Sequence, residues 1–584
     1  MTIRGRLRHL AVATGTFLLA AWITSFAAPA LAMPTCATLA TDPHNGLVGD
    51  PAIKSVTSAI ASASAPNAAY CSVHLLYGTN PNQNINIFLA MPLSAADGGS
   101  GGLQGAWNGR TQGIGGGGCA GVADTAPLLP AMNAGYVGSG TDLGHSGGNC
   151  EPGVNADGTY NFQFIEDFIR NAIKEQILYS KSVARTYYGL KPSYNYWNGC
   201  STGGRQGYLL AQELGRELDG ILAAAPAIYW TRFQTAQMWG QIAMKQLTGG
   251  TISLAKLAQV QASAVKACDA NDGIKDGVID DPRTCTFDAT QNVCGNPNAP
   301  ATNCLTAAEA QAVNKIWDGP RNRKANRIWF GLDRGTDFSI LDGTAPFALG
   351  VTQFHWDEHN LSFDWQTVSL DEYPQVAQDG SRNIADVTDT FAPLDDFKAH
   401  GGKLLTWVGG NDQFIYPRGV INYYRAMAVR YSRFGDADFG NLQKFYRLFR
   451  APGVGHCGIN SAGPIPVDPF DALVTWVEKG TPPQTLLASG GSAAPPTGRT
   501  RPLCPYPQTA IYNGAGSTDV ASSFHCGGDL ETKQTVCADV LTRYKHEKNG
   551  NLDFSGTGLA AFECHVPDHD HDHDDDDVAM KDER

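Results

Sequence analysis

The fold prediction rests on residues 194–208, which read Tyr194-Asn195-Tyr196-Trp197-Asn198-Gly199-Cys200-Ser201-Thr202-Gly203-Gly204-Arg205-Gln206-Gly207-Tyr208. A β-prone aromatic run leads here into Gly-x-Ser-x-Gly and then into a helical pattern, which is the layout of a nucleophile elbow. Such a turn exposes the serine hydroxyl above a sheet, and its glycines let two backbones pass close together. Ser201 is therefore the candidate nucleophile. The alternative is a serine that only caps a buried helix.

A second match to the same pattern occurs at Gly144-His145-Ser146-Gly147-Gly148. It follows a strand-like run but continues into Asn149-Cys150-Glu151-Pro152-Gly153, which cannot begin a helix. We predict a loop at this second match.

The first 32 residues have the layout of a secretory signal peptide. Arg4, Arg6 and Arg8 precede an apolar run over residues 10–28, and Ala30-Leu31-Ala32 offers a cleavage site. An uncleaved membrane anchor is the alternative, although no later stretch is long and apolar enough to span a bilayer. We therefore expect a mature chain that begins near Met33, is secreted or periplasmic, and has no membrane partner after cleavage.

Cysteine usage and charge narrow the class of protein further. All fourteen cysteines lie downstream of the signal segment and none stands in a Cys-x-x-Cys pair, which predicts disulfides rather than a redox or zinc site. The formal net charge of −13 comes largely from residues 568–584, which hold nine Asp or Glu against Lys581 and Arg584. The rest of the mature chain has no basic patch, which argues against a nucleic-acid partner.

The order of the expected strands and helices predicts an α/β fold. Residues 34–92 alternate short β-prone runs with polar turns, as antiparallel strands do. Helical spacing over residues 162–188 precedes the elbow strand, and residues 218–226 indicate the next buried strand. Strand, helix and strand in that order imply a parallel sheet. The expected fold is that of an α/β-hydrolase, with a doubly wound, mostly parallel sheet.

A long insertion interrupts this alternation after the nucleophile. Its helical pieces at 254–267 and 307–317, its many aromatic residues and its Gly-rich turns predict a lid over the sheet. Beyond it, strands are expected near 402–412 and 444–449, and helices at 416–429 and 466–479. The chain then divides into a signal peptide (1–32), the first part of the hydrolase domain (33–227), a lid domain (228–390), the second part of the hydrolase domain (391–503), a disulfide-bonded C-terminal extension (504–564) and a His/Asp-rich tail (565–584).

A glycine run, Gly115-Gly116-Gly117-Gly118, directly follows an expected strand. Unhindered backbone N–H groups in such a loop can supply half of an oxyanion hole. We expect one donor from Gly117 or Gly118 and the other from the N–H of Thr202. A flexible linker is the alternative for the glycine run.

The acid and the base are expected in the chain order Ser, Asp, His. Asp412 ends an expected strand in Gly409-Gly410-Asn411-Asp412, and His456 lies in a loop after the next strand. His456 would take the proton of Ser201 while Asp412 orients the imidazole. The rival candidates, Asp395, His400 and His525, do not follow an expected core strand.

Cys200 adjoins the candidate nucleophile, and Cys457 adjoins the candidate base. If Ser201 and His456 touch, their neighbours come within a few ångström of each other, near disulfide distance. We therefore predict a Cys200–Cys457 bridge that fastens the two loops together. Two unrelated structural cysteines are the alternative.

Together, Gly-Cys-Ser-x-Gly-Gly, an Asp after a strand and a His-Cys dipeptide resemble the tannase and feruloyl esterase family, which includes the mono(2-hydroxyethyl) terephthalate hydrolases. The resemblance runs from about Cys36 to Cys526. It implies the same Ser-His-Asp triad, the same Cys200–Cys457 bridge and a lid domain.

The resemblance also implies a structural calcium site in the lid, at residues 269–278. Three carboxylates at short spacing in a Gly-punctuated loop suit a hard cation with oxygen ligands. The expected ligands are the side chains of Asp269, Asp272 and Asp276 and the carbonyls of Ile274 and Val278. A solvated acidic turn is the alternative.

Proximity and the resemblance pair most of the remaining cysteines. The implied bridges are Cys36–Cys71, Cys268–Cys285, Cys294–Cys304 and Cys504–Cys526. This leaves Cys119 with Cys150 and Cys537 with Cys564, two pairs that the terephthalate branch does not share.

The sequence thus predicts a secreted serine esterase for aromatic carboxylic esters, of feruloyl esterase or tannase type. A terephthalate monoester hydrolase is the first alternative, and Ile415 weakens it because that branch places Phe three residues after the acid. A peptidase of the same fold and a non-catalytic calcium-dependent binding module are the others. The aromatic residues expected to hold the substrate ring, unless they form the lid's own core, are Trp329, Phe330, Phe338, Phe347, Phe354 and Trp356. The His/Asp tail can bind divalent metal loosely, although a disordered solubilising segment is favoured.

Overall fold

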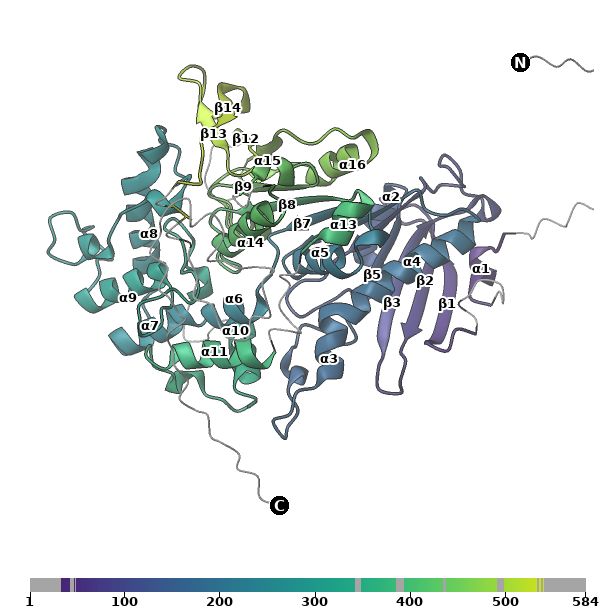
Figure 1. Ribbon diagram of the computed structural model, residues 1–584, viewed down its shortest axis with the longest axis horizontal. Coiled ribbons are helices and arrows are strands. Elements are labelled where there is room, and N and C mark those ends of the chain that lie inside the picture. The colour runs from purple at the N-terminus through teal and green to yellow at the C-terminus, as the bar shows by residue number, and fades with distance from the viewer. Residues whose placement is uncertain are drawn as a thin grey trace, which may run out of the picture.

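A nine-stranded sheet forms the centre of the computed structural model (Figure 1). The structure describes residues 33–41, 47, 49–341, 348–384, 393–433, 437–490, 498–532, 535, 536 and 539. In spatial order the strands run β1-β2-β3-β5-β4-β6-β7-β8-β9. Their bounds are Ile53–Ala61 (β1), Tyr70–Tyr77 (β2), Ile85–Pro92 (β3), Arg110–Ile114 (β4), Val137–Thr141 (β5), Tyr194–Cys200 (β6), Gly220–Ala224 (β7), Lys403–Gly409 (β8) and Tyr446–Ala451 (β9).

The sheet is antiparallel at one end and parallel through the rest. The pairs β1–β2, β2–β3 and β3–β5 are antiparallel, whereas every pair from β5 to β9 is parallel. The carboxyl ends of the parallel strands therefore meet at one edge of the sheet, where ligands bind in open α/β sheets. This arrangement confirms the mostly parallel sheet that the sequence predicts.

Helices cover both faces of the sheet, because alternate strand residues point to opposite sides. Trp197, Ile221 and Leu404 belong to the larger core, while their neighbours Tyr196 and Leu222 belong to a second core on the other face. The larger core is closed by α4 (Ala172–Tyr188), α5 (Thr202–Glu213) and α14 (Pro417–Arg430), and the second core by α16 (Pro469–Lys479). The doubly wound arrangement is thereby confirmed.

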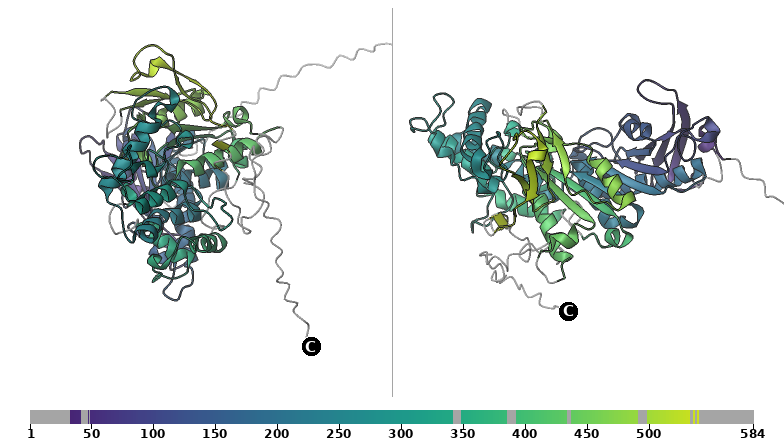
Figure 2. Two further views of the ribbon diagram at one scale, coloured as in Figure 1. Left: turned by 90° about the vertical axis from the view of Figure 1, so that its left-hand side faces the viewer. Right: turned by 90° about the horizontal axis from the view of Figure 1, so that it is seen from above.

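The inserted segment, which we call the lid, forms a group of helices at the end of the molecule opposite β1 (Figures 1 and 2). The predicted helices at 254–267 and 307–317 correspond to α8 and α9, whereas the other four have no counterpart in the sequence prediction. The lid helices are α6 (Trp230–Ala236), α7 (Trp239–Thr248), α8 (Leu254–Cys268), α9 (Ala307–Asp318), α10 (Ala348–Asp357) and α11 (Tyr373–Asn383). Within the described residues, no helix has the length and apolar character needed to cross a membrane.

Short elements complete the architecture. Two small antiparallel sheets, β10-β11-β12 and β13-β14, follow the main sheet in the chain. The closing helix α16 begins at Pro469 rather than Pro466, because Ile465 and Pro466 pair with β11 instead. The remaining bounds are α1 (Cys36–Leu39), α2 (Leu129–Asn133), α3 (Phe162–Glu166), α13 (Asp395–His400), α15 (Phe439–Leu442), β10 (Ile465–Pro466), β11 (Leu486–Ser489), β12 (Thr500–Leu503), β13 (Thr509–Tyr512) and β14 (Phe524–Gly527).

Six of the seven expected disulfides are present in the described part of the chain. Cys537 and Cys564, the expected seventh pair, lie outside the described residues, as do the signal segment and the His/Asp tail. The six bridges are Cys36–Cys71, Cys119–Cys150, Cys200–Cys457, Cys268–Cys285, Cys294–Cys304 and Cys504–Cys526.

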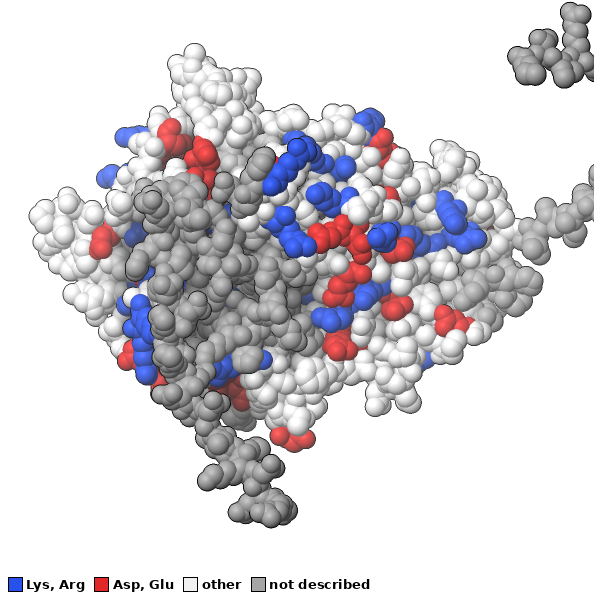
Figure 3. All heavy atoms as spheres, viewed as in Figure 1, with Lys and Arg blue, Asp and Glu red and all other residues white. Residues whose placement is uncertain are grey.

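The face of the molecule in Figure 3 carries charges of both signs close together. Ion pairs of the protein include Lys174 with Glu213 at 3.2 Å and Arg216 with Asp396 at 2.8 Å. Exposed pairs of this kind contribute little to stability, about 0–1 kcal/mol each.

Candidate active site

Ser201 lies on the sharp turn between β6 and α5, as the sequence predicts. Its backbone has φ 62° and ψ −123°, a region that non-glycine residues rarely adopt. The flanking glycines are required by space: a Cβ on Gly199 would lie 2.5 Å from a backbone atom of Gly203, and one on Gly204 would lie 2.4 Å from the Ala224 oxygen. Side chains at these positions would push the turn away from β7.

Asp412 and His456 form a buried pair at the carboxyl edge of the sheet. The Nδ1–H of His456 donates to Oδ2 of Asp412 at 2.8 Å, and the other carboxylate oxygen accepts the N–H groups of Phe414 and Ile415 at 2.9 Å each. Asp412 is only 2% exposed and His456 only 7%. Because Nδ1 carries the shared proton, the Nε2 atom remains free to accept one.

Two further contacts hold the imidazole of His456 in place. The backbone N–H of His456 donates to Oε1 of Gln413 at 3.0 Å. The ring of Phe414 packs edge-on against the imidazole, with 5.2 Å between the ring centroids. The loop after Asp412 therefore holds both the predicted acid and the predicted base in place.

Ser201 and His456 line the same pocket, which has a volume of about 170 Å³. Among the described residues, the Ser201 hydroxyl makes no hydrogen bond, to His456 or to any other group. Catalytic hydrogen bonds often form only once substrate is bound. The predicted Cys200–Cys457 disulfide joins the two loops, with 6.2 Å between its Cα atoms.

The glycine loop after β4 is fastened to the first turn of α5. Thr202 donates its hydroxyl to the Gly118 carbonyl at 2.6 Å, and the Gly203 N–H donates to the Gly116 carbonyl at 2.9 Å. The Gly117 N–H already donates to the Ala120 carbonyl at 2.9 Å. Gly118 lines the pocket, so it is the better candidate of the two predicted glycines for an oxyanion donor.

The Thr202 N–H belongs to the first turn of α5, where backbone N–H groups have no acceptor within the helix. The positive end of the helix dipole also points toward this turn. Thr202 and Gly118 thus bring two backbone donors to one wall of the pocket that Ser201 lines.

The aromatic walls of the pocket differ from those expected. The aromatic residues proposed from the sequence, Trp329, Phe330, Phe338, Phe354 and Trp356, are buried in the lid or beneath it, and Phe347 lies outside the described residues. They belong to clusters of buried hydrophobic residues, Phe354 to one within the lid and the other four to the larger core.

The residues that do line the pocket come from two short segments that the sequence analysis passed over. Trp230, Phe233, Gln234 and Gln237 come from α6 and its C-terminal end, and Phe414 follows the acid. No contrast between a polar and an apolar face marked those on α6, because its polar residues are as buried as its apolar ones. Ile415, which the sequence analysis noted, lines the pocket as well.

The rival acid and base candidates have other partners. His400 lies 3.6 Å from Asp219, His525 is hydrogen-bonded to Asn513 at 2.6 Å, and Asp395 pairs with Arg430 at 2.6 Å. None of the three candidates lines the pocket of Ser201. The second Gly-x-Ser-x-Gly match, at 144–148, is a loop as expected.

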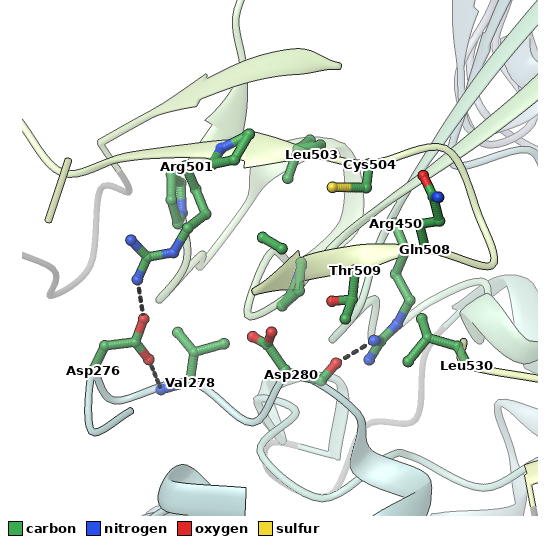
Figure 4. Close-up of a pocket in the computed structure, with 14 residues that line it drawn as sticks. Asp276, Val278, Asp280, Arg450, Arg501, Leu503, Cys504, Gln508, Thr509 and Leu530 are labelled. Atoms are coloured by element: carbon green, nitrogen blue, oxygen red, sulfur yellow. Dashed lines mark hydrogen bonds and ion pairs between the residues drawn. The ribbon is translucent and has the colours of Figure 1, made fainter. Parts of the chain in front are cut away.

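The acidic loop proposed to bind calcium curls around Asp269. One oxygen of Asp269 accepts N–H groups of Asp276 and Gly277 at 3.0 Å each and of Val278 at 3.3 Å. Asp272 accepts the Ile274 N–H at 3.0 Å. Figure 4 shows the far end of this loop, where Asp276 pairs with Arg501.

The crowded negative charges of this loop suit a hard cation, although the described carboxylates do not converge on one point. Burial, together with the nearby charges of Asp276 and Asp269, raises the pKa of Asp272. Asp280, which the sequence analysis did not consider, places its carboxyl group in the same region (Figure 4), and burial followed by the charges of Asp272 and Asp276 raises its pKa to about 7. Crowded carboxylates of this kind favour a bound cation. Within the described residues, however, no three acidic, His or Cys groups converge to ligating distance.

The comparison with known families decides where the chain belongs. Residues 103–527 match the family model of tannase and feruloyl esterase. The chain is a member of the tannase and feruloyl esterase family. The matched segment runs from the loop before β4 to the end of β14, and it includes Ser201, Asp412 and His456.

Individual relatives in this family agree with the assignment. The chain is 34% identical over 500 residues to a probable feruloyl esterase of Arthroderma benhamiae, covering 80% of this chain and 88% of the relative. It is 33% identical to an uncharacterized esterase of Xanthomonas campestris, covering 68% and 75%. This family member is therefore a carboxylic ester hydrolase of feruloyl esterase or tannase type.

Solved structures of the family show the same fold. Feruloyl esterase B from Aspergillus oryzae superposes with a TM-score of 0.69 at 24% identity, covering 81% of this chain and 96% of the other. Tannin acyl hydrolase from Aspergillus niger gives 0.73 at 22% identity, covering 89% and 100%. The fold of this tannase and feruloyl esterase family member is that of an α/β-hydrolase.

Proposed function

We propose that the protein is a secreted esterase that hydrolyses aromatic, phenolic carboxylic esters through Ser201, His456 and Asp412. One observation carries the proposal: Ser201, on its strained turn, shares a pocket with His456, whose other ring nitrogen is held by buried Asp412. The mature chain would act outside the cytoplasm, which the six disulfides support.

The first half-reaction forms an acyl-enzyme. Nε2 of His456 takes the proton from the Ser201 hydroxyl as the oxygen attacks the ester carbonyl carbon. The carbonyl oxygen becomes an oxyanion, which the N–H groups of Thr202 and Gly118 stabilise; each such donor contributes on the order of a hundred- to a thousandfold in rate. His456 then gives the proton to the departing alcohol, and the acyl group stays on Ser201.

The second half-reaction returns the free enzyme. Water enters where the alcohol left, His456 removes one of its protons, and the resulting attack on the acyl carbon forms a second oxyanion at the same donors. Its collapse breaks the bond to Ser201, which recovers its proton from His456, and releases the carboxylic acid. Asp412 stays ionised and stabilises the imidazolium in both steps.

An aromatic acyl group suits the walls of the pocket. Trp230, Phe233 and Phe414 present flat apolar surfaces beside Ser201. Aromatic rings pack well against such surfaces in offset or edge-on geometry.

The terephthalate monoester alternative has less support. Its substrate carries a second carboxylate, and the described residues that line the pocket include no Lys or Arg to pair with it. Ile415 also stands where that branch has Phe, and it lines the pocket.

We further propose a structural calcium ion in the lid loop, held by the side chains of Asp269, Asp272 and Asp276 and the carbonyls of Ile274 and Val278. A bound calcium ion would neutralise the crowded carboxylates whose burial raises the pKa of Asp272. None of these residues lines the pocket of Ser201, so the ion would stabilise the lid and take no part in the reaction.

A substrate panel tests the proposed function. Methyl ferulate, methyl gallate, chlorogenate, a terephthalate monoester and an anilide of ferulic acid would be offered to the wild type and to Ser201→Ala. We expect turnover of the phenolic esters by the wild type, a loss of at least about a thousandfold in kcat for Ser201→Ala, and no cleavage of the anilide. Equal rates for the two proteins would overturn the proposed nucleophile, and cleavage of the anilide would favour a peptidase.

A further inference from the structure

One face of α6 forms a wall of the pocket and mixes two kinds of side chain. Trp230, Phe233, Gln234 and Gln237 stand at spacings of three and four residues, so they share one side of the helix and its C-terminal end. All four line the pocket that holds Ser201. A helix face buried against a core carries apolar residues at these positions. Here half of the positions carry a carboxamide.

Both carboxamides are buried and incompletely paired. Gln234 is 2% exposed and Gln237 is 3% exposed. The Oε1 atom of each has no hydrogen-bond partner among the described residues. Native proteins pair nearly all buried polar atoms, so an orphaned acceptor beside a reaction site calls for an explanation.

The orientation of Gln237 is fixed by its other amide atom. Its Nε2–H donates to the backbone carbonyl of Phe414 at 2.8 Å. Exchanging the amide oxygen and nitrogen would set two oxygens against each other, which excludes the flipped arrangement. The unpaired atom of Gln237 is therefore an acceptor. It requires a donor from whatever enters the pocket.

We infer that Gln234 and Gln237 determine specificity by accepting a hydrogen bond from a hydroxyl group on the aromatic ring of the acyl moiety. This inference rests on the proposed function. A ring packed on Trp230 and Phe233 lies along the same helix face, so its substituents reach the adjacent carboxamides. The last torsion of the Gln234 side chain is soft, so a small rotation can turn its Oε1 toward the ring, while the Oε1 of Gln237 is already held in place.

The chemistry of the acceptors selects one substituent over another. A phenolic hydroxyl donates a hydrogen bond, whereas a methoxy oxygen has no hydrogen to donate. A methoxy group at the same place would leave both glutamine oxygens unpaired and put a third acceptor beside them. Sites that hydrogen-bond a substrate hydroxyl strongly reject analogues without it, because their own polar groups remain unpaired.

The test compares two esters that differ only in this substituent. Methyl p-coumarate and its p-methoxy analogue have the same alcohol, so the ratio of their kcat/KM values reports on the ring hydroxyl alone. We expect the wild type to prefer the hydroxylated ester by about tenfold or more, Gln234→Met to lower the ratio, and the double variant Gln234→Met with Gln237→Met to bring the ratio close to one. Methionine keeps the length and volume of glutamine but removes the acceptor.

Gln241→Met is the matched control. Gln241 lies in the neighbouring helix α7, is 3% exposed and also has an unpaired amide atom, but it does not line the pocket. We expect its substitution to leave the substrate ratio at the wild-type value. If Gln234→Met lowers both rates equally and keeps the ratio, the glutamine has only a packing role and the inference is overturned.

A binding measurement separates this inference from the proposed reaction. Titration of Ser201→Ala with p-coumaric acid and with p-methoxycinnamic acid should show tighter binding of the hydroxylated acid, and adding both Gln234→Met and Gln237→Met should remove the difference. A difference in binding without any ester turnover would sustain the inference and overturn the proposed reaction. Ester turnover without a difference in binding would do the reverse.

Discussion

At the scale of single residues, the turn at Ser201 shows how sterics fix the identity of several positions. Gly199 and Gly204 are needed because neighbouring backbones approach too closely for a Cβ. The positive φ of Ser201 itself is an unfavourable conformation, held by the strand before it and the helix after it. The turn thus places the hydroxyl at the mouth of the pocket at a cost in local strain.

Gly204→Ala should destabilise the protein by about 1–3 kcal/mol, because the new Cβ would lie 2.4 Å from the Ala224 oxygen. Urea unfolding at constant pH would measure the loss. Gly117→Ala is the control, since a Cβ there meets nothing within 4 Å and its φ is ordinary for an L-residue. Equal stability of the two variants would contradict the steric account of the turn.

Asp412→Asn should lower kcat by about 10³- to 10⁴-fold, because an amide favours the wrong tautomer of His456 and leaves the imidazolium unsupported. Steady-state kinetics on methyl ferulate would show the loss in kcat rather than in KM. Asp395→Asn should leave turnover at the wild-type level, since Asp395 pairs with Arg430 and does not line the pocket. A comparable loss in both variants would reassign the acid.

At the scale of elements, the sequence predicted those that have a strong local pattern. The strands β6, β7, β8 and β9 are short runs rich in aromatic and aliphatic residues, and the elbow stands at the end of β6. Topology then follows, because parallel strands bring their carboxyl ends to one edge. The pairing of Cys200 with Cys457 could be inferred for the same reason.

Other elements left no readable pattern. Every residue of α6 is buried, so the helix shows no contrast between a polar and an apolar face. The strands β10 to β14 have two to four residues each, too few for alternation to show. The pocket wall formed by α6 and the Asp280 carboxyl were missed because their roles arise from tertiary contacts.

The Cys200–Cys457 bridge ties the loop after β6 to the loop after β9. Replacing both cysteines with Ser should lower kcat by about tenfold or more, because small displacements of a nucleophile from its base are costly. The control is the double Ser variant of Cys294 and Cys304, a bridge within the lid that spans ten residues. Unchanged turnover after loss of the first bridge would refute its positioning role.

Removal of calcium should lower the melting temperature of the wild type, because an ion bound only by the folded protein stabilises it by mass action. Differential scanning calorimetry with EDTA, and again after added Ca²⁺, would measure the effect. Asp272→Asn should melt at the same temperature under both conditions. If the melting temperature of the wild type changes with neither EDTA nor added Ca²⁺, the proposed site is ruled out.

At the scale of the whole molecule, a buried ionic cluster joins the C-terminal segment to the lid and to the hydrolase domain. Asp539 accepts from Arg418 at 2.7 Å and from Arg283 at 3.1 Å, and Arg425 lies 3.5 Å away. Arg283 belongs to the lid, whereas Arg418 and Arg425 belong to α14. Glu531 pairs with Arg425 at 2.8 Å. Glu531 and Asp539, which lie beyond the segment that matches the family, thus connect the lid with the hydrolase domain.

Asp539→Asn should lower the stability by about 3 kcal/mol or more at neutral pH, because it leaves buried arginines without their counter-charge. Burial alone would raise the pKa of Asp539, but Arg418, Arg283 and Arg425 outweigh it and lower the pKa to about 2. A carboxyl group whose pKa is lower in the folded protein stabilises the fold at pH values above its ordinary pKa. This stabilisation is lost as the pH falls and the carboxylate is protonated.

The difference between the wild type and Asp539→Asn should therefore shrink as the pH falls from about 4 to about 2. Chemical denaturation across this range would measure it. Asp396→Asn is the control: its partner Arg216 is 69% exposed and Asp396 is 61% exposed, so the loss should stay below about 1 kcal/mol. A difference that grows on acidification would contradict the assigned sign.

The bridge between residues 200 and 457 also sets where in a cell the protein can work. A bond between sulfurs persists outside the cytosol and is reduced within it. In newly made chains that are still inside the producing cell, the bridge would be absent and Ser201 and His456 would be held only loosely. Such chains would hydrolyse esters in that compartment slowly. In a chain exported as we propose, oxidation on the way out would act as a maturation step. A preparation made in a reducing host should therefore gain specific activity when it is oxidised, without any change in amount of protein.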